Sequence, residues 1–214
     1  MWWLIIQGPM QNYRTVKKFL NGYENVIWSG WKSDATVLSS EKHVVINDPP
    51  TTAGPGNLNY QLISTLGGLK YAKNLGIKNV LKIRSDMALL DLQKFLTILK
   101  EDQLNFLCCH ENENRPYLLD YVFAGSVDVF LDALNDCFEN ETFDMMYENQ
   151  FAEARITCSI VKKTDREQLK NINFFLFDLN SDIDIYWLKK QIYLTSYKIE
   201  ACYNKHKTFP ILLR

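Results

Sequence analysis

Three charged side chains interrupt an otherwise apolar segment, residues 79–90 (NVLKIRSDMALL). Lys82, Arg84 and Asp86 are two residues apart, so along an extended strand they project from the same face. The carboxylate of Asp86 is suited to a divalent cation that bridges two phosphates, because Mg²⁺ and Mn²⁺ favour carboxylate and phosphate oxygens. Arg84 beside it can donate a forked pair of hydrogen bonds to a phosphate or a carboxylate. The pattern is consistent with a site for a phosphorylated ligand at the end of a strand.

A purely structural role for the same aspartate also fits the sequence. Residues 86–95 (DMALLDLQKF) could begin a helix with Asp86 or Asp91 as its N-cap, since aspartate is favoured at that position. The residue pattern by itself leaves the ligand-binding and the capping interpretations both open.

The elements that must position this segment alternate between strand and helix. In the first half, apolar runs and amphipathic segments predict strands at 2–6, 26–31, 43–47 and 79–83 and helices at 12–20 and 59–75. The second half adds helices at 91–102, 126–138 and 148–163, strands at 104–109, 121–125 and 172–178, and an extended segment at 193–203. Strands separated by helices predict an α/β fold, a three-layer domain with a mostly parallel central sheet, and one domain over residues 1–214.

In such a sheet, ligands bind beyond the carboxyl ends of the strands. Those ends carry polar, loop-forming residues at 7–9 (QGP), 29–31 (SGW), 47–50 (NDPP) and 84–86 (RSD). All four segments are therefore expected at one edge of the sheet.

The predicted helix at 59–75 has one apolar stripe, formed by Leu62, Leu66, Leu69 and Ala72. Two adjacent glycines, residues 67–68, lie inside it and cost roughly 1 kcal/mol each relative to alanine. Close approach of a neighbouring element would explain them.

The composition is that of a globular protein. Hydrophobic residues make up 47% and charged residues 23% of the 214 residues, and the net charge of -1 gives no argument for a nucleic-acid partner. No apolar run approaches the length that crosses a bilayer, and the apolar start is expected to be a strand, not a signal peptide. The five cysteines form no CxxC pair, which favours reduced, buried thiols in a cytoplasmic setting.

Taken together, several segments resemble the lipopolysaccharide-synthesis glycosyltransferases of the WavE type, a family with a GT-A-like, Rossmann-like fold that includes similar domains of large DNA viruses. The longest similar stretch is 57–87 (NLNYQLISTLGGLKYAKNLGIKNVLKIRSDM). Shorter similar stretches are 5–10 (IIQGPM), 26–34 (VIWSGWKSD), 47–49 (NDP), 119–125 (LDYVFAG), 148–156 (ENQFAEARI) and 174–190 (FFLFDLNSDIDIYWLKK).

The resemblance implies that Arg-Ser-Asp takes the place of the Asp-x-Asp motif of this fold class. Asp86 would then contact a metal ion, Mn²⁺ or Mg²⁺, or the diphosphate itself. The other implied nucleotide-sugar residues are Gln7, Gly8 and Pro9 in the first loop, Asn59 and Gln61 at the start of a helix, and Arg84 and Ser85 beside Asp86. The chain departs from the family at Tyr60, where relatives often have arginine, and at Arg84, where the first carboxylate of Asp-x-Asp would be.

The activity implied is that of a hexosyltransferase, which moves a sugar from a nucleotide-diphosphate sugar, with UDP as the expected nucleotide, to a hydroxyl of a glycan or glycoprotein. Surface polysaccharide, lipopolysaccharide and viral capsid glycan are the acceptors that the family suggests. Residues 1 to about 90 would bind the donor and residues from about 91 to 214 the acceptor. The expected location is the cytoplasm, the host cytoplasm for a viral protein, either free or peripheral to a membrane.

Inverting transfer requires a carboxylate base for the acceptor hydroxyl, whereas retaining transfer does not. Asp120, Glu148 and Glu153 are the candidates, although an acid at a helix start such as Glu148 is also favoured structurally. His206 lies where some GT-A enzymes have a late metal ligand, and a surface role is its alternative. The literal Asp-x-Asp at 182–184 is interpreted as a solvated loop or a helix cap, and a metal site is its alternative.

Two other functions remain open. A nucleotidyltransferase is also an α/β enzyme with a carboxylate-bound Mg²⁺, but it usually has a basic, glycine-rich loop near the first strand, and residues 6–14 (IQGPMQNYR) are poor in both. A non-catalytic module that binds a nucleotide sugar or a glycan would accommodate the departures at Tyr60 and Arg84.

Overall fold

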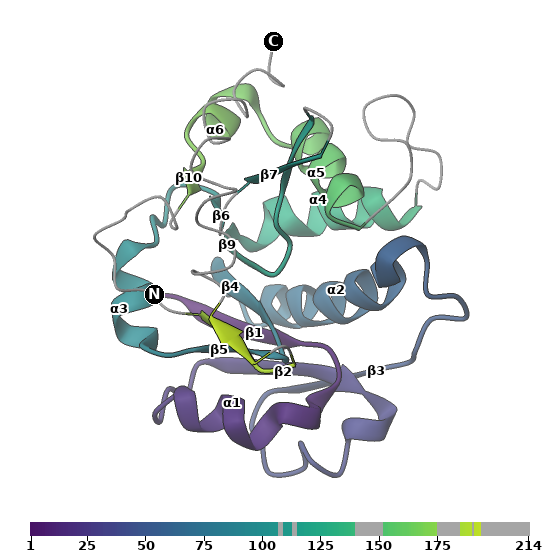
Figure 1. The fold of residues 1–214 in the computed structure, drawn as a ribbon, viewed down its shortest axis with the longest axis vertical. Coiled ribbons are helices and arrows are strands. Elements are labelled where there is room, and N and C mark those ends of the chain that lie inside the picture. The colour runs from purple at the N-terminus through teal and green to yellow at the C-terminus, as the bar shows by residue number, and fades with distance from the viewer. Residues whose placement is uncertain (107–108, 113–114, 140–151, 175–184, 190, 194–214) are drawn as a thin grey trace.

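A computed structural model describes residues 1–106, 109–112, 115–139, 152–174, 185–189 and 191–193 (Figure 1). A seven-stranded sheet in the order β10-β6-β9-β4-β1-β2-β3 forms its centre. These strands are β1 (Trp3–Gln7), β2 (Val26–Trp31), β3 (Val44–Asn47), β4 (Asn79–Arg84), β6 (Asn105–Phe106), β9 (Val122–Ser126) and β10 (Asn173–Phe174). Neighbouring strands are parallel except at β9, which runs antiparallel to both β4 and β6.

Helices cover both faces of this sheet (Figure 1). They are α1 (Tyr13–Phe19), α2 (Leu58–Asn74), α3 (Leu92–Ile98), α4 (Val127–Glu139), α5 (Ala152–Lys163) and α6 (Arg166–Lys170). Side chains alternate along β1, so Leu4 and Ile6 pack with α1 and α3 while Ile5 packs with α2 on the opposite face. The predicted α/β class, with three layers and a mostly parallel central sheet, is thereby confirmed.

The packing of α2 accounts for both its apolar stripe and its glycines. Leu62, Leu66, Leu69 and Ala72 are all buried, as predicted. A Cβ atom at Gly68 would lie 2.5 Å from Cγ2 of Ile5, and one at residue 67 would lie 2.2 Å from an oxygen of the Asn47 side chain. The two glycines therefore allow the helix to lie directly on β1 and β3.

Short strands outside the main sheet were not predicted. β5 (Met87–Leu89), β11 (Ile185–Trp187) and β12 (Ile192–Tyr193) form a three-stranded sheet, and β7 (Cys109–Asn112) pairs with β8 (Arg115–Leu118). The predicted helix at 148–163 begins at Ala152 within the described part, and most of the predicted segments 172–178 and 193–203 lie outside the described residues.

The capping alternative for Asp86 is wrong. Asp86 lies in the turn between β4 and β5, whereas α3 begins after Asp91, whose carboxylate accepts a hydrogen bond of 3.0 Å from the backbone N–H of Lys94. The extended β5 separates the two aspartates, so only Asp91 can cap this helix.

Replacing Asp91 by alanine should therefore lower the free energy of unfolding by about 0.5–2 kcal/mol, the usual effect of losing an N-cap. Urea denaturation followed by circular dichroism measures the change. An unchanged midpoint and slope would contradict the assigned cap.

Two further expectations from the sequence concern membrane-spanning helices and the state of the cysteines. Within the described ranges, no helix is long and apolar enough to span a bilayer. Burial raises the pKa of the Cys137 thiol and of the Cys158 thiol to about 11, so both are protonated at neutral pH. Cys137 is a free, buried thiol, as the sequence predicts, whereas Cys158 is free and half-buried.

Candidate functional site

A pocket of about 600 Å³ lies beyond the carboxyl ends of β1, β2 and β4. We call it the strand-end pocket. Its lining residues are Gln7, Gly8, Pro9, Gln11, Asn12, Trp31, Gly56, Asn57, Tyr60, Gln61, Arg84, Ser85, Asp86 and Lys189. The volume is within the range of small-molecule sites, and its place in the sheet is where α/β proteins bind ligands.

The loop after β1 and the turn after β4 are tied together at the floor of this pocket. The backbone N–H of Ser85 donates to the carbonyl of Gln7 (2.8 Å), and its hydroxyl donates to the carbonyl of Pro9 (2.7 Å). Gly8 has φ +110°, and a Cβ there would lie 3.0 Å from the Ser85 hydroxyl oxygen. Glycine is therefore required where the loop approaches the turn most closely.

Gln7 is joined to α2 from the opposite side. Its side chain is buried, and its carbonyl oxygen accepts a 2.5 Å hydrogen bond from the hydroxyl of Ser64. The backbone carbonyl of Ser64 in turn accepts a 2.6 Å bond from the hydroxyl of Ser29 on β2. This chain of hydrogen bonds fixes the second turn of α2 relative to the ends of β1 and β2.

Asp34, which the sequence analysis did not single out, connects two of the segments that border the pocket. Its carboxylate accepts hydrogen bonds from the backbone N–H groups of Met10 (3.2 Å) and Trp31 (2.9 Å), and it therefore links the loop after β1 to the end of β2. The aspartate follows the carboxyl end of a strand by three residues, which is the signal that could have identified it.

An aromatic pair forms part of the lining. The rings of Trp31 and Tyr60 meet edge to face, with centroids 5.3 Å apart and an interplanar angle of 83°. Trp31 is buried, whereas 37% of Tyr60 is exposed. Tyr60 thus presents an aromatic side chain to the pocket at the position where the resembling family often has arginine.

Arg84 and Asp86 form a two-pronged ion pair at the end of β4. Nε of Arg84 donates to Oδ1 of Asp86 (2.9 Å), and Nη2 donates to Oδ2 (2.7 Å). Burial alone would lower the pKa of the Arg84 guanidinium, but the hydrogen bonds and charge of Asp86 outweigh it and raise that pKa. The guanidinium carbon also lies 5.1 Å from the centre of the Tyr121 ring. Arg84 is therefore a fixed positive charge.

Lys82 and Asp120 lie buried behind this ion pair. Lys82 is fully enclosed, and its ammonium group donates to the backbone carbonyl of Asp120 and lies 5.0 Å from the centre of the Phe123 ring. Burial lowers the pKa of Lys82 to about 8, although the negative charge of Asp120 acts in the opposite direction. Neither carboxylate oxygen of Asp120 has a hydrogen-bond partner among the described residues.

Two of the three candidate bases, Asp120 and Glu153, lie among the described residues. Asp120 is buried and Glu153 lies in the first turn of α5, and neither lines the strand-end pocket. Glu148 lies outside the described residues, as do the candidate metal ligand His206 and the Asp-x-Asp at 182–184. The assignment of a base therefore stays a prediction.

The resemblance implies a metal ion at Asp86, which lines the strand-end pocket. Across the described ranges, no three histidine, cysteine or acidic side chains come together in a way that could hold a metal ion. Asp86 is the single carboxylate among the described lining residues, and both of its oxygens accept hydrogen bonds from Arg84. The described residues therefore provide one carboxylate, already paired with a positive guanidinium, which is a poor ligand set for a divalent cation.

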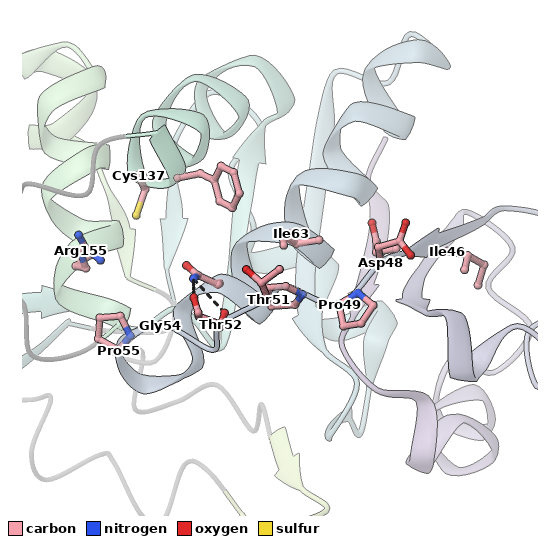
Figure 2. Close-up of a pocket in the computed structure, with 14 residues that line it drawn as sticks. Ile46, Asp48, Pro49, Thr51, Thr52, Gly54, Pro55, Ile63, Cys137 and Arg155 are labelled. Atoms are coloured by element: carbon pink, nitrogen blue, oxygen red, sulfur yellow. Dashed lines mark hydrogen bonds between the residues drawn. The ribbon is translucent and has the colours of Figure 1, made fainter.

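A second, larger pocket of about 1000 Å³ lies between the start of α2 and the helices α4 and α5, and we call it the α2–α4 pocket. In Figure 2, Cys137 and Arg155 come from the helices, and the loop with Thr51 and Thr52 crosses opposite them. Asn59 lines this pocket and not the strand-end pocket, and its amide donates to Thr52. None of the residues at 7–9 or 84–86 lines it.

Comparisons with known proteins give structural matches only. No family model matches the sequence, and no curated protein matches it. One similar solved structure is the mannose-1-phosphate geranyltransferase from Thermus thermophilus, at 9% identity and a TM-score of 0.41, over 64% of this chain and 63% of that one. Another is HddC from Yersinia pseudotuberculosis complexed with GMP-PN, at 15% identity and a TM-score of 0.39, over 61% of this chain and 79% of that one. This chain thus matches less than two thirds of the length of the first.

Proposed function

We propose that the strand-end pocket binds a nucleotide-diphosphate sugar and that the chain is a glycosyltransferase, which moves the sugar to a hydroxyl of a glycan. One observation carries the proposal. All the residues assigned to the nucleotide sugar from the sequence, except Asn59, line this single pocket. They come from three separate segments, 7–9, 61 and 84–86, that only the fold brings together.

The positive side chains of the pocket are suited to stabilising a negatively charged leaving group. A nucleoside diphosphate leaves readily when its developing negative charge is stabilised, and positive groups already in position do this without reorganisation. Arg84 and Lys189 are the cations among the described lining residues. Trp31 and Tyr60 offer an apolar surface for a base or a sugar ring.

The acceptor proposed from the family resemblance is a surface polysaccharide, lipopolysaccharide or viral capsid glycan. For an inverting reaction, Glu153 and Asp120 are the described candidates for the base that takes the proton of the acceptor hydroxyl. Transfer in the cytoplasm, or at a membrane surface facing it, fits these acceptors.

A nucleotidyltransferase is the second candidate, because that class also binds nucleotides at this edge of an α/β sheet. It would join a nucleoside triphosphate to a sugar phosphate and release pyrophosphate. The loop that follows β1 and borders the pocket (8–12, GPMQN) contains no basic residue, whereas a nucleotidyltransferase usually has a basic, glycine-rich loop near its first strand. Pyrophosphate release from UTP, GTP or dTTP with hexose-1-phosphates would support this second candidate instead.

The proposed function is tested by calorimetric titration of UDP-, GDP- and dTDP-sugars into the wild-type protein and into Asp86→Ala. The variant should bind the preferred donor at least about tenfold more weakly, because loss of two charge-assisted hydrogen bonds releases Arg84 from its position. It should also lose transfer to an acceptor while it stays folded by far-UV circular dichroism, although the loss of the covered ion pair lowers its unfolding midpoint.

Asp91→Ala is the matched control, since it removes a nearby aspartate that only caps α3. It should keep wild-type donor affinity. Equal donor affinity in Asp86→Ala and the wild type would contradict the assigned site, and failure of every nucleotide sugar to bind folded protein would contradict the function.

A further inference from the structure

The Arg84–Asp86 ion pair occupies the place where a metal-binding pair of carboxylates is expected. Both side chains are mostly covered, with exposed fractions of 23% for Arg84 and 17% for Asp86. A divalent cation held by Asp86 would need the carboxylate oxygens that now accept the two hydrogen bonds from Arg84. A cation bound there would share its ligand atoms with the positive guanidinium of Arg84, so charge repulsion opposes its binding while the ion pair is kept.

The surroundings favour keeping the ion pair. The guanidinium is held by Asp86 on one side and lies over the ring of Tyr121 on the other. Removing a partly buried guanidinium from its carboxylate leaves both charges less compensated, which costs more in a covered site than at an exposed surface. The carboxylate thus serves to orient Arg84.

The charges that line the pocket are already suited to an anion. Two cations, Arg84 and Lys189, line it with one carboxylate, Asp86, among the described residues. A third cation, Lys82, is buried behind them on the same strand face as Arg84. A guanidinium presents its donors in a plane and stays charged at all physiological pH values, and this geometry matches phosphate oxygens.

We propose that Arg84, oriented by Asp86 and assisted by Lys189, provides the positive charge for the donor diphosphate, so that the protein binds its nucleotide without a divalent cation. This inference rests on the proposed function, because it takes a nucleoside diphosphate as the ligand of the strand-end pocket. In it Arg84 contacts the ligand and Asp86 is a positioning residue.

Calorimetric titration of UDP, GDP and dTDP, each in EDTA and each in MnCl₂, tests the inference. The preferred diphosphate should bind with the same affinity, within about twofold, under both conditions. Arg84→Gln should weaken binding by at least about tenfold in both, since a charged hydrogen bond to phosphate is lost. Arg84→Lys should restore part of the affinity, and Asp86→Asn should reduce it less than Arg84→Gln does.

Lys170→Gln removes an exposed lysine that does not line the pocket and should leave the affinity unchanged. Binding that requires Mn²⁺, and that Asp86→Asn abolishes while Arg84→Gln does not, would overturn the inference and leave the proposed function intact. Failure of all three diphosphates to bind in either buffer would overturn both. The two failures are therefore distinguishable.

Discussion

Between pH 8 and pH 10.5, the free energy of unfolding of the wild-type protein should rise by about 3 kcal/mol relative to that of Lys82→Met. Burial lowers the pKa of Lys82 to about 8, whereas the unfolded chain has the ordinary value of 10.5. Between these values the unfolded chain holds a proton that the folded protein has released, so stability increases with pH. Below pH 8 both states are protonated and this group adds no pH dependence. Urea denaturation of both proteins over this range gives the difference.

Comparison with Lys82→Met removes the contribution of other groups that titrate at alkaline pH. Asp120→Asn gives a second check, because the charge of Asp120 raises the pKa of Lys82. Without that charge, the rise in stability should begin at a lower pH. Parallel pH curves for the wild type and Lys82→Met would show that Lys82 is not desolvated in the way the structure indicates.

Gly68→Ala should destabilise the protein by about 1–3 kcal/mol, the usual range for overpacking a core. In an exposed helix the same change would gain about 1 kcal/mol of helix propensity. Here the new Cβ would lie 2.5 Å from Cγ2 of Ile5, which is fully buried on a central strand. The χ1 angle of a β-branched side chain is stiff, so Ile5 cannot turn away. Thermal and urea unfolding measure the loss.

Two substitutions at Ile5 separate this clash from a general weakening of the core. Ile5→Leu removes the Cγ2 methyl with little change in volume and should recover part of the stability lost in Gly68→Ala. Ile5→Val keeps that methyl and should recover none. A double-mutant cycle without coupling for Ile5→Leu would show that the contact is not the cause.

Long periodic segments were predictable and short paired strands were not. The stripe on α2 predicted a helix at 59–75, and the structure has Leu58–Asn74. By contrast, β5 has three residues and pairs with β11, whose residues lie far along the chain. Three residues are too few to establish a period, and the stabilising contacts are not local. The segment was therefore open to a helical interpretation that only the pairing excludes.

In the candidate site, too, the features set by local sequence pattern were predictable and those set by long-range pairing were not. Strand ends at 7–9 and 84–86 were expected at one edge of the sheet and meet in one pocket. Asn59 and Gln61 were expected to act together, but two residues on a helix differ by about 200° in direction, so they line different pockets. Lys189 was missed because its place in the pocket depends on the pairing of β11 with β5.

That pairing has a consequence for the order in which a newly made chain becomes functional. The backbone N–H of Leu188 donates to the carbonyl of Asp86 (2.9 Å), and the next residue, Lys189, lines the pocket. During translation the parallel strands β1 to β4 leave the ribosome before these residues do. A nascent chain that already has its central strands would still lack the hydrogen bond on the Asp86 turn and the cation that Lys189 supplies. The strand-end pocket is therefore complete only after residues 185–189 have been made and β11 has paired with β5.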